Sequence, residues 1–445
     1  MTGTPNSEAI STKLQRIAEL ARSMPQTALT NLSHHIDVEW LREAFRRTRK
    51  DGAAGVDGQT WSDYEKDLAT NLASLLTRFK SGSYRAPPVR RVHIPKGDGN
   101  ETRPIGIPTL EDKVLQRAVA MCLSAVYEQD FMNCSHGFRP NRSAHTALDR
   151  LREAVMDMWG GWLIEVDIRR FFDTLDHAHL RSILERRVRD GVILRTIGKW
   201  LNAGVLEGAS LSFPDQGTPQ GGVISPLLAN VYLHEVLDKW IEERVKPKCH
   251  GNVVVVRYAD DFVILFRAES DARAVYAALP KRFAEYGLSL HPDKTRLIPF
   301  RQPPRRGPKE HVSFDFLGFT HTWMKTSKGI WVLFQVTSRK RLSRSLSRIR
   351  TWLAQHRHDP IGVQQQALSQ KLRGHYAYFG KTGNAPRLKS FYEEVRREWK
   401  KWLGRRSWKG ALFWENFQRI AERHPLPRPH LVHGPAPPRC CKPST

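Results

Sequence analysis

Hydrophobic positions along this 445-residue chain change from helical to strand spacing several times. Near the N-terminus, Leu14, Ile17, Ala21 and Met24 recur every three or four residues, as on an amphipathic helix. The same spacing predicts further helices, and in the last of them Pro280 lies inside the pattern. These helices are expected at residues 36–50, 63–82, 110–131, 181–201, 216–245 (entered through a Gly/Pro loop) and 273–287.

Short apolar runs bounded by turn residues predict strands between these helices. Residues 89–107 suggest either two strands around a Gly/Asn turn or a longer hairpin loop. Residues 253–258 with 262–266 suggest a hairpin. Further strands are expected at 162–168, 313–321 and 329–336. Helices mixed with hairpins favour an α+β core, and the chain is expected to become all-helical after a boundary near residues 335–345.

Charge changes this picture, because it is concentrated at one end. The net charge is +26, and residues 301–445 carry 30 Lys and Arg against 8 Asp and Glu, a net +22. Such a basic region with interleaved aromatic residues is typical of a nucleic-acid partner. A solvated surface or an anionic membrane is the alternative interpretation, although no apolar run is long enough to span a bilayer.

The five cysteines are Cys122, Cys134, Cys249, Cys440 and Cys441, with no C-x-x-C pair among them. No secretory signal opens the chain. This usage indicates a reducing, cytoplasmic location and predicts no structural zinc.

Two adjacent carboxylates, Asp260 and Asp261, interrupt the apolar hairpin in the stretch RYADDFVIL. Side by side at the end of apolar strands they repel each other and lose hydration, so a divalent metal would compensate them. An exposed turn with both side chains in water is an equally good interpretation of this stretch alone.

Asp167 ends another apolar strand, in WLIEVDIRRFFDTLDH. If this strand neighbours the hairpin, three carboxylates face one point and suit Mg²⁺, the ion of phosphoryl-transfer sites. Asp173 and Asp176 are expected to be helix-entry charges. Glu165 either supports the metal site or is solvated.

Several further motifs follow one another in a fixed order. They are IPKGDGNETRPIGIP, QGTPQGGVISPLLANVYL, GLSLHPDKTRLIPF and FDFLGF, with DGAAGVDGQT upstream. In this order the chain resembles the group II intron-encoded reverse transcriptase/maturase family, over about residues 30–430. The resemblance implies a right-hand polymerase fold of fingers and palm, followed by an all-helical thumb or maturase domain.

The resemblance also implies roles for individual residues. Asp167, Asp260 and Asp261 would be catalytic and, with the backbone carbonyl of Ile168, would hold two Mg²⁺ ions, with Mn²⁺ as a substitute. The incoming dNTP would be bound by the nucleotide-binding residues Lys96, Arg103, Phe172 and Gln220. Primer and template would be bound by Tyr258, Lys294, Gly318, Arg344 and Arg348.

Without the resemblance, each of these residues has a simpler interpretation. Lys96 and Arg103 would be solvated charges, and Phe172 or its neighbour Phe171 a core aromatic. The Trp side chains at 399, 402 and 408 are expected to be core rather than base-stacking platforms.

The family also implies a division into domains. An N-terminal helical extension (1–30) would precede an N-terminal loop and fingers (31–160) and a palm (161–335, with part of the fingers at about 180–215). A helical thumb or maturase domain (336–420) and a Pro-rich basic tail (421–445) would follow.

Partners follow from the same resemblance. Group II intron RNA, an RNA template and a DNA primer or target are expected, with no membrane, in a bacterial cytoplasm and on the nucleoid. The H-N-H endonuclease domain of some members is expected to be absent. The alternatives are a domesticated or defence-associated reverse transcriptase, or an RNA-binding splicing factor only.

Overall fold

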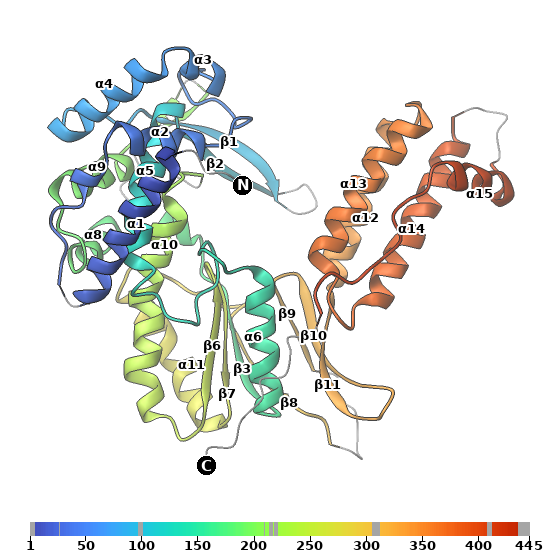
Figure 1. The fold of residues 1–445 in the computed structure, drawn as a ribbon. Coiled ribbons are helices and arrows are strands. Elements are labelled where there is room, and N and C mark those ends of the chain that lie inside the picture. Colours follow the sequence, from blue (N-terminus) through green and yellow to red (C-terminus); the bar gives the residue numbers. More distant parts are fainter. Residues whose placement is uncertain are drawn as a thin grey trace. The chain divides into compact units, whose positions relative to one another are not determined.

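The computed structural model of the chain describes residues 5–25, 27–96, 101–208, 210–212, 217, 221–304, 312–406 and 412–434. It divides into two compact units, residues 1–147 with 163–297 and residues 148–162 with 298–445. Helices and mostly antiparallel sheets are mixed along it, which confirms the expected α+β composition (Figure 1). In the described parts of the chain, no helix combines the length and apolar character needed to cross a membrane.

Amphipathic helices open the first unit. Asp37 caps α2 by accepting from the Trp40 amide at 2.9 Å, and Trp40 then donates from its indole to Ala118 of α5 at 3.0 Å. This direct bond joins α2 to α5, the long helix of this region. The helices are α1 (Pro5–Ser23), α2 (Val38–Arg46), α3 (Trp61–Lys66), α4 (Leu68–Ser81) and α5 (Leu110–Tyr127). The next helix, α6 (Ala144–Asp157), begins in the first unit, and its residues from 148 onward belong to the second.

Arg187 ties α1 to the rest of this unit. Its buried guanidinium pairs with Asp130 at 2.7 Å and donates to the carbonyls of Ala21, Met24 and Thr27. The end of α1 is therefore held by an interior charge, in addition to the exposed hydrogen bonds that Arg22 donates to Gln129.

The expected single helix over 181–201 is wrong, because the chain breaks into α8 (His177–Glu185) and α9 (Gly191–Leu201). Asp190 begins the second helix by accepting from the amides of Val192 and Ile193 at 2.9 and 3.0 Å. Its other oxygen accepts from the Leu32 and Ser33 amides. The spacing of apolar residues cannot predict a helix cap that also binds a distant segment.

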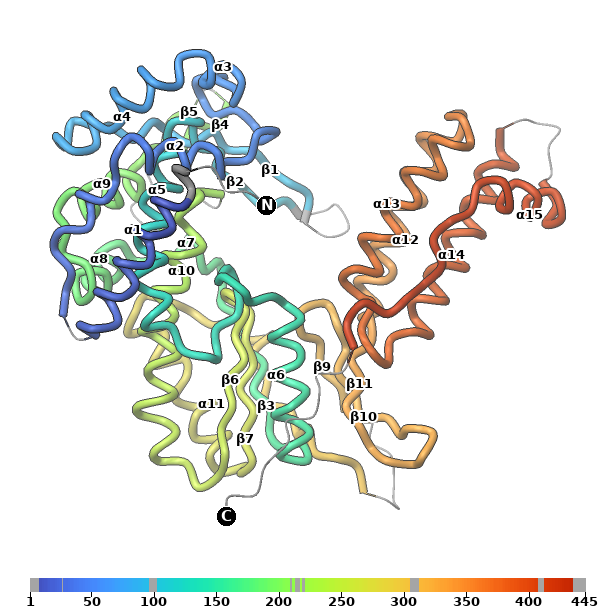
Figure 2. The backbone as a smooth tube through the Cα atoms, in the orientation of Figure 1, coloured from blue at the N-terminus to red at the C-terminus, as the bar shows by residue number. Residues whose placement is uncertain are grey.

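Two sheets support the first unit's helices. The expected strands around residues 89–107 are confirmed as the antiparallel pair β1 (Val89–Lys96) and β2 (Glu101–Ile107), and the sheet order is β2-β1-β4-β5. The second sheet has the order β6-β7-β3-β8. Figure 2 shows β6, β7 and β3 running side by side. The remaining strands are β3 (Gly160–Val166), β4 (Val205–Glu207), β5 (Ser210–Ser212), β6 (Val253–Tyr258), β7 (Asp261–Phe266) and β8 (Arg296–Arg301).

Further helices cover this sheet region. α10 (Ser225–Leu233) begins where expected and continues in wider π-helical turns at His234–Asp238 and Ile241–Val245. α11 (Glu269–Ala284) forms despite Pro280 and contacts β7. Short helical turns lie at Ser33–His35, at α7 (Phe171–Thr174) and at Lys246–Lys248.

The second unit contains a three-stranded antiparallel sheet of order β11-β10-β9. The strand expected over 313–321 is instead two strands, β9 (Ser313–Phe316) and β10 (Phe319–Lys325), which pair directly. Leu317 and Gly318 between them have φ of 50° and 81°, the left-handed values that a two-residue hairpin turn favours. The third strand, β11 (Trp331–Thr337), follows.

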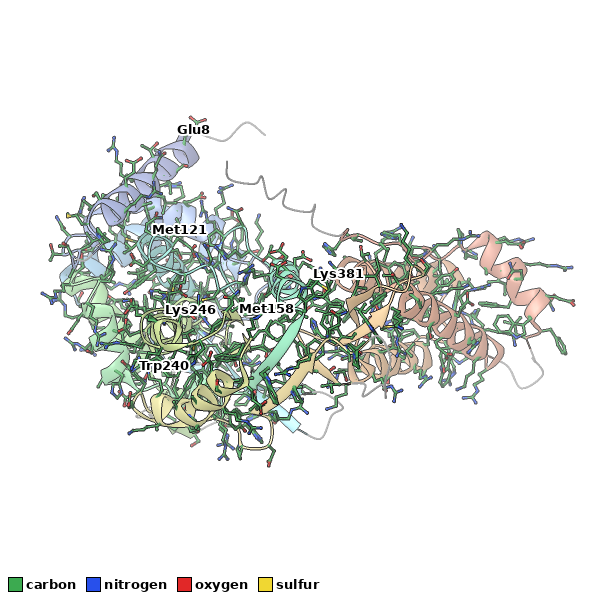
Figure 3. The ribbon with its side chains drawn as sticks, turned by 90° about the horizontal axis from the view of Figure 1, so that it is seen from below. Glu8, Met121, Met158, Trp240, Lys246 and Lys381 are labelled. Carbon is green, nitrogen blue, oxygen red and sulfur yellow. The ribbon has the colours of Figure 1, made fainter. Side chains whose placement is uncertain are left out.

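Four helices complete the second unit, in line with the expected all-helical region. They bury apolar stripes such as Leu346, Ile349 and Leu353, and Trp399 lies fully inside with its indole donating to Gln364 at 2.9 Å. Lys381, which is labelled in Figure 3, is buried. It is paired with Asp149. The helices are α12 (Arg339–Gln355), α13 (Ile361–Phe379), α14 (Ala385–Gly404) and α15 (Trp414–Arg423).

Candidate active site

The hairpin of β6 and β7 carries the Y-A-D-D stretch at its tip. Tyr258 pairs with Asp261, so Ala259 and Asp260 alone form the turn. The flanking apolar runs are buried, which explains their composition. Ala259 has φ of 57°, a left-handed value that costs a non-glycine residue about 1 kcal/mol. The turn is thus held in a conformation that its own sequence does not favour.

Asp167 lies at the end of β3, the neighbour of β7 in the sheet. Beyond β3, the amide of His291 donates to the Asp167 carbonyl at 2.8 Å, and the amide of Arg169 donates to Ser289 at 2.8 Å. These bonds fix the backbone on which the Asp167 carboxylate stands. The two carboxylate-bearing strands are neighbours in the sheet, which is the condition on which the sequence interpretation depended.

Ile168 forms an antiparallel bridge with Leu290 through those same two bonds, which its flanking residues make. In an antiparallel ladder the carbonyls of successive residues point to opposite sides of the strand. The Ile168 carbonyl therefore points away from Leu290. Because β3 lies between β7 and β8 in the sheet, that side is the side of β7.

Asp167 lies close enough to Asp260 to affect the pKa of its carboxyl group. Burial raises the pKa of Asp260, and repulsion from Asp167 raises it further, while the positive charge of Arg103 opposes the change. Asp261 is exposed at the start of β7. The carboxylates of Asp260 and Asp167 therefore repel each other, and a bound cation would reduce that repulsion.

The expected convergence of three carboxylates on one point is not reached among the described residues, where no three His, Cys, Asp or Glu side chains are close enough to hold a metal. One Asp167 oxygen is instead bound by Lys294, with Nζ 2.9 Å from Oδ2. The donor chemistry still suits a divalent ion, since carboxylate and carbonyl oxygens are hard ligands.

Lys294 was expected at the primer or template backbone, and here it contacts a carboxylate. Both partners are half-exposed, so the pair is held weakly, at about 0–1 kcal/mol. Glu165, for which two roles were open, is paired with Arg296 at 2.5 Å. Asp176 caps α8 by accepting from the His179 amide at 2.7 Å, as expected.

A buried polar network lies behind the turn, and sequence reasoning missed it. Arg257 is fully buried; its Nε lies 2.9 Å from Asp238 and its Nη1 donates to Asn230 at 2.8 Å and to the carbonyl of Ala259 at 3.2 Å. Burial opposes ionisation of Asp238, but the Arg257 charge outweighs it and lowers the pKa of Asp238 to about 2. The turn carbonyl is thus held by a permanently charged donor.

The segment before Phe138 packs against the same turn. Arg257 donates its amide to Cys134 and accepts from the His136 amide, both at 2.8 Å. A Cβ on Gly137 would lie 2.4 Å from the Ala259 nitrogen, so only glycine permits this approach. The stretch HGFRP was not singled out in the sequence, and a Gly-Phe pair in a loop gives no signal of this contact.

The nucleotide-binding candidates lie on separate elements. Arg103 is exposed on β2, and its charge reaches Asp260. Lys96 ends β1 opposite Glu101, and its side chain lies outside the described residues, as does Gln220. Gly221, just after Gln220, packs so closely on β2 that a Cβ would lie 2.5 Å from the Gly106 carbonyl.

The sequence left open whether Phe171 or Phe172 is the core aromatic, and the two rings differ in burial. Phe171 is buried and packs edge-on against Tyr232, with ring centroids 6.4 Å apart. Phe172 is half-exposed, 5.3 Å from the Phe171 ring. Of this pair, Phe171 is the core aromatic.

Three of the primer-binding candidates belong to the second unit. Gly318 forms the β9–β10 turn described above, and Tyr378 donates to the neighbouring Leu317 carbonyl at 2.8 Å. Arg344 and Arg348 lie on α12, the first half-buried and the second exposed. Tyr258 stays in the first unit at the Y-A-D-D turn.

Paired carboxylates at the tip of a sheet hairpin and the end of its neighbouring strand define a nucleotidyltransferase of the polymerase type. Residues 94–321 match the reverse transcriptase (RNA-dependent DNA polymerase) family, and the chain belongs to it. Reverse transcriptases generally use divalent metal ions.

Among its relatives, protein YkfC of Escherichia coli K12 is 35% identical, over 68% of this chain and 87% of YkfC. The group II intron-encoded protein LtrA of Lactococcus lactis is 43% identical, over 51% of this chain and 38% of LtrA. The putative COX1/OXI3 intron 1 protein of Saccharomyces cerevisiae is 26% identical, over 68% of this chain and 42% of that protein. The chain thus spans less than half the length of these two intron proteins.

Proposed function

We propose that this protein is a group II intron-encoded RNA-directed DNA polymerase that extends a primer 3′-OH with dNTPs on an RNA template. The observation that carries the proposal is the placement of Asp167 at the end of β3, beside the β6–β7 turn that bears Asp260. Two Mg²⁺ ions, when bound, would activate the primer hydroxyl and offset charge on the leaving phosphate.

In this proposal the chain's own residues prepare and position the substrates. Asp167, Asp260 and Asp261, with the Ile168 carbonyl, supply the oxygen ligands. Lys294 exchanges Asp167 for a phosphate as substrates enter, since an exposed ion pair is readily broken. Arg103 and Lys96 neutralise the triphosphate, and the family resemblance implies a role for Gln220 near the templating pair. Phe172 excludes a ribose 2′-OH by its bulk.

We assign the fingers to residues 31–160, the palm to 161–335 and the thumb or maturase domain to 336–420. The net +22 of residues 301–445 suits a grip on RNA through phosphates, because A-form grooves offer side chains little sequence. Gly318, Arg344 and Arg348 would contribute to it. The relationship to LtrA supports intron RNA as that partner, with roles in splicing and retrohoming.

Primer extension with the purified full chain tests the enzymatic part. Asp260→Ala should abolish Mg²⁺-dependent extension of a DNA primer on an RNA template. Asp67→Asn removes an exposed charge ahead of α4 and should leave extension unchanged. Extension that survives Asp260→Ala would overturn the metal assignment, and loss with both variants would point to a general effect of charge.

A further inference from the structure

Phe138 combines two unfavourable features at one position. Its side chain is 59% exposed to solvent, although it is a large apolar ring. Its backbone has φ of 55°, in the left-handed region that few non-glycine residues adopt. Neither feature serves the packing of the core, and residues held in this way are concentrated at functional sites.

The chain on both sides of Phe138 is held firmly, so its exposure does not result from a loose loop. On one side, Gly137 packs against the Ala259 nitrogen and its carbonyl accepts from the buried Asn230 at 2.7 Å. On the other side, Arg139 is buried, pairs with Glu128 at 2.9 Å and donates to the carbonyl of Met132 at 2.7 Å. Buried polar groups therefore force this ring outward.

The exposed ring stands beside the catalytic turn. Its centroid lies 6.3 Å from that of Tyr258, with the two planes tilted by 38°. Tyr258 is half-exposed and comes two residues before Asp260. Together the rings present aromatic surface to solvent next to the carboxylates.

We propose that Phe138 and Tyr258 form an aromatic shelf on which the terminal nucleotide of the primer packs. The inference rests on the proposed polymerase function, since the nucleotide that must lie at the Y-A-D-D turn is the one bearing the reacting 3′-OH. Aromatic rings bind bases through their faces, and Phe138 has no polar atom with which to read one. The shelf therefore holds the primer end without preference for its sequence.

Equilibrium binding of a fluorescent primer–template duplex to the full chain, without dNTPs, tests the shelf even if extension fails. Phe138→Ala should raise the Kd about tenfold, the loss of one base–aromatic stack. Phe138→Trp, which keeps an aromatic face, should bind within about twofold of the parent protein. Leu20→Ala removes an exposed apolar side chain from α1 and serves as the matched control.

Thermal unfolding separates binding from a structural role. Because Phe138 is exposed and strained, Phe138→Gly should leave Tm unchanged or raise it while weakening duplex binding. A lower Tm with an unchanged Kd would overturn the proposal and assign the ring to folding.

A base analogue locates the contact along the duplex. With 2-aminopurine at the primer 3′ end, the parent protein should change its fluorescence on binding, and Phe138→Ala should remove most of that change. The same probe several base pairs inside the duplex should respond equally in both proteins. An identical response of both proteins to the terminal probe would rule out the shelf.

Discussion

Lys294 Nζ lies 2.9 Å from Asp167 Oδ2, so a cation of the protein itself occupies one oxygen of the proposed metal site. Lys294→Ala should therefore lower the Mg²⁺ concentration needed for half-maximal extension, because the ion no longer competes for Asp167. It should also lower the maximal rate about tenfold if the lysine then serves a phosphate. The measurement is a Mg²⁺ titration of primer extension; an unchanged midpoint would argue against competition at Asp167.

We expect Arg257 to contribute to primer extension independently of its contribution to the stability of the fold. Arg257→Ala leaves the buried Asp238 without its arginine partner, at a cost of about 3–5 kcal/mol. Replacing both partners, in Arg257→Met with Asp238→Leu, should restore much of the unfolding free energy. It should not restore extension, because the Ala259 carbonyl still lacks its donor. Full activity of the double variant would show that the turn does not need Arg257.

Neighbouring phenylalanines offer a matched pair for sugar selection. Phe172→Ala should admit ribonucleotides with little loss of stability, since the ring is half-exposed. Phe171→Ala should instead lower the unfolding free energy by about 3–5 kcal/mol, because that ring is buried. Incorporation of rNTP against dNTP and thermal unfolding measure the two effects. Unchanged discrimination in Phe172→Ala would move the gate to another residue.

RNA binding by α12 should depend on salt. Arg348 is exposed on this helix. Arg348→Ala should reduce the slope of log Kd against log salt by about 1, the change expected when one phosphate contact is lost. Arg350 on the same helix is paired with Glu398 at 2.8 Å, so Arg350→Ala should change the slope less. Equal slopes in the parent and in Arg348→Ala would mean that this arginine meets no phosphate.

Asp112 should make folding sensitive to pH. It is buried, and although Tyr84, Trp200 and Gln116 donate to it, burial raises its pKa from 3.8 to about 6. The folded state then holds a proton that the unfolded state releases between pH 3.8 and about 6, so this contribution to stability is lost as pH rises across that window.

Denaturant unfolding from pH 4 to 7 measures this effect. The parent protein should lose a few kcal/mol more than Asp112→Asn, whose side chain does not ionise. A parallel pH dependence of the two proteins would mean that Asp112 is ionised throughout.

Local patterns were enough to predict much of the fold. The hairpin at residues 253–266, the two strands within 89–107 and the helix containing Pro280 lie where the spacing of apolar residues puts them. The sequence raised the adjacency of β3 to this hairpin only as a condition for the carboxylates to meet, and the sheet order fulfils that condition. The hairpins and the helix containing Pro280 depend on residues close together in the sequence, whereas the pairing of β3 with β7 joins segments far apart in it.

What failed depends on contacts or backbone values that spacing does not encode. Asp190 caps the start of α9 and also accepts hydrogen bonds from a segment far away in the chain. Residues 313–321 read as one strand, because nothing in the pattern shows that Leu317 and Gly318 both take positive φ. The Lys294–Asp167 pair joins residues 127 positions apart. Partner choice of this kind is decided only when the chain is folded.

The bonds of Arg187 also bear on how this protein can be shortened. Its guanidinium donates to three carbonyls at the end of α1 and in the loop after it, and only Asp130 would remain as a partner if residues 1–27 were deleted. A protein shortened in this way would therefore leave buried hydrogen-bond donors of Arg187 without acceptors, and we expect it to aggregate. The first helix is part of the minimal folding unit, and engineering of a compact enzyme should begin its trimming elsewhere.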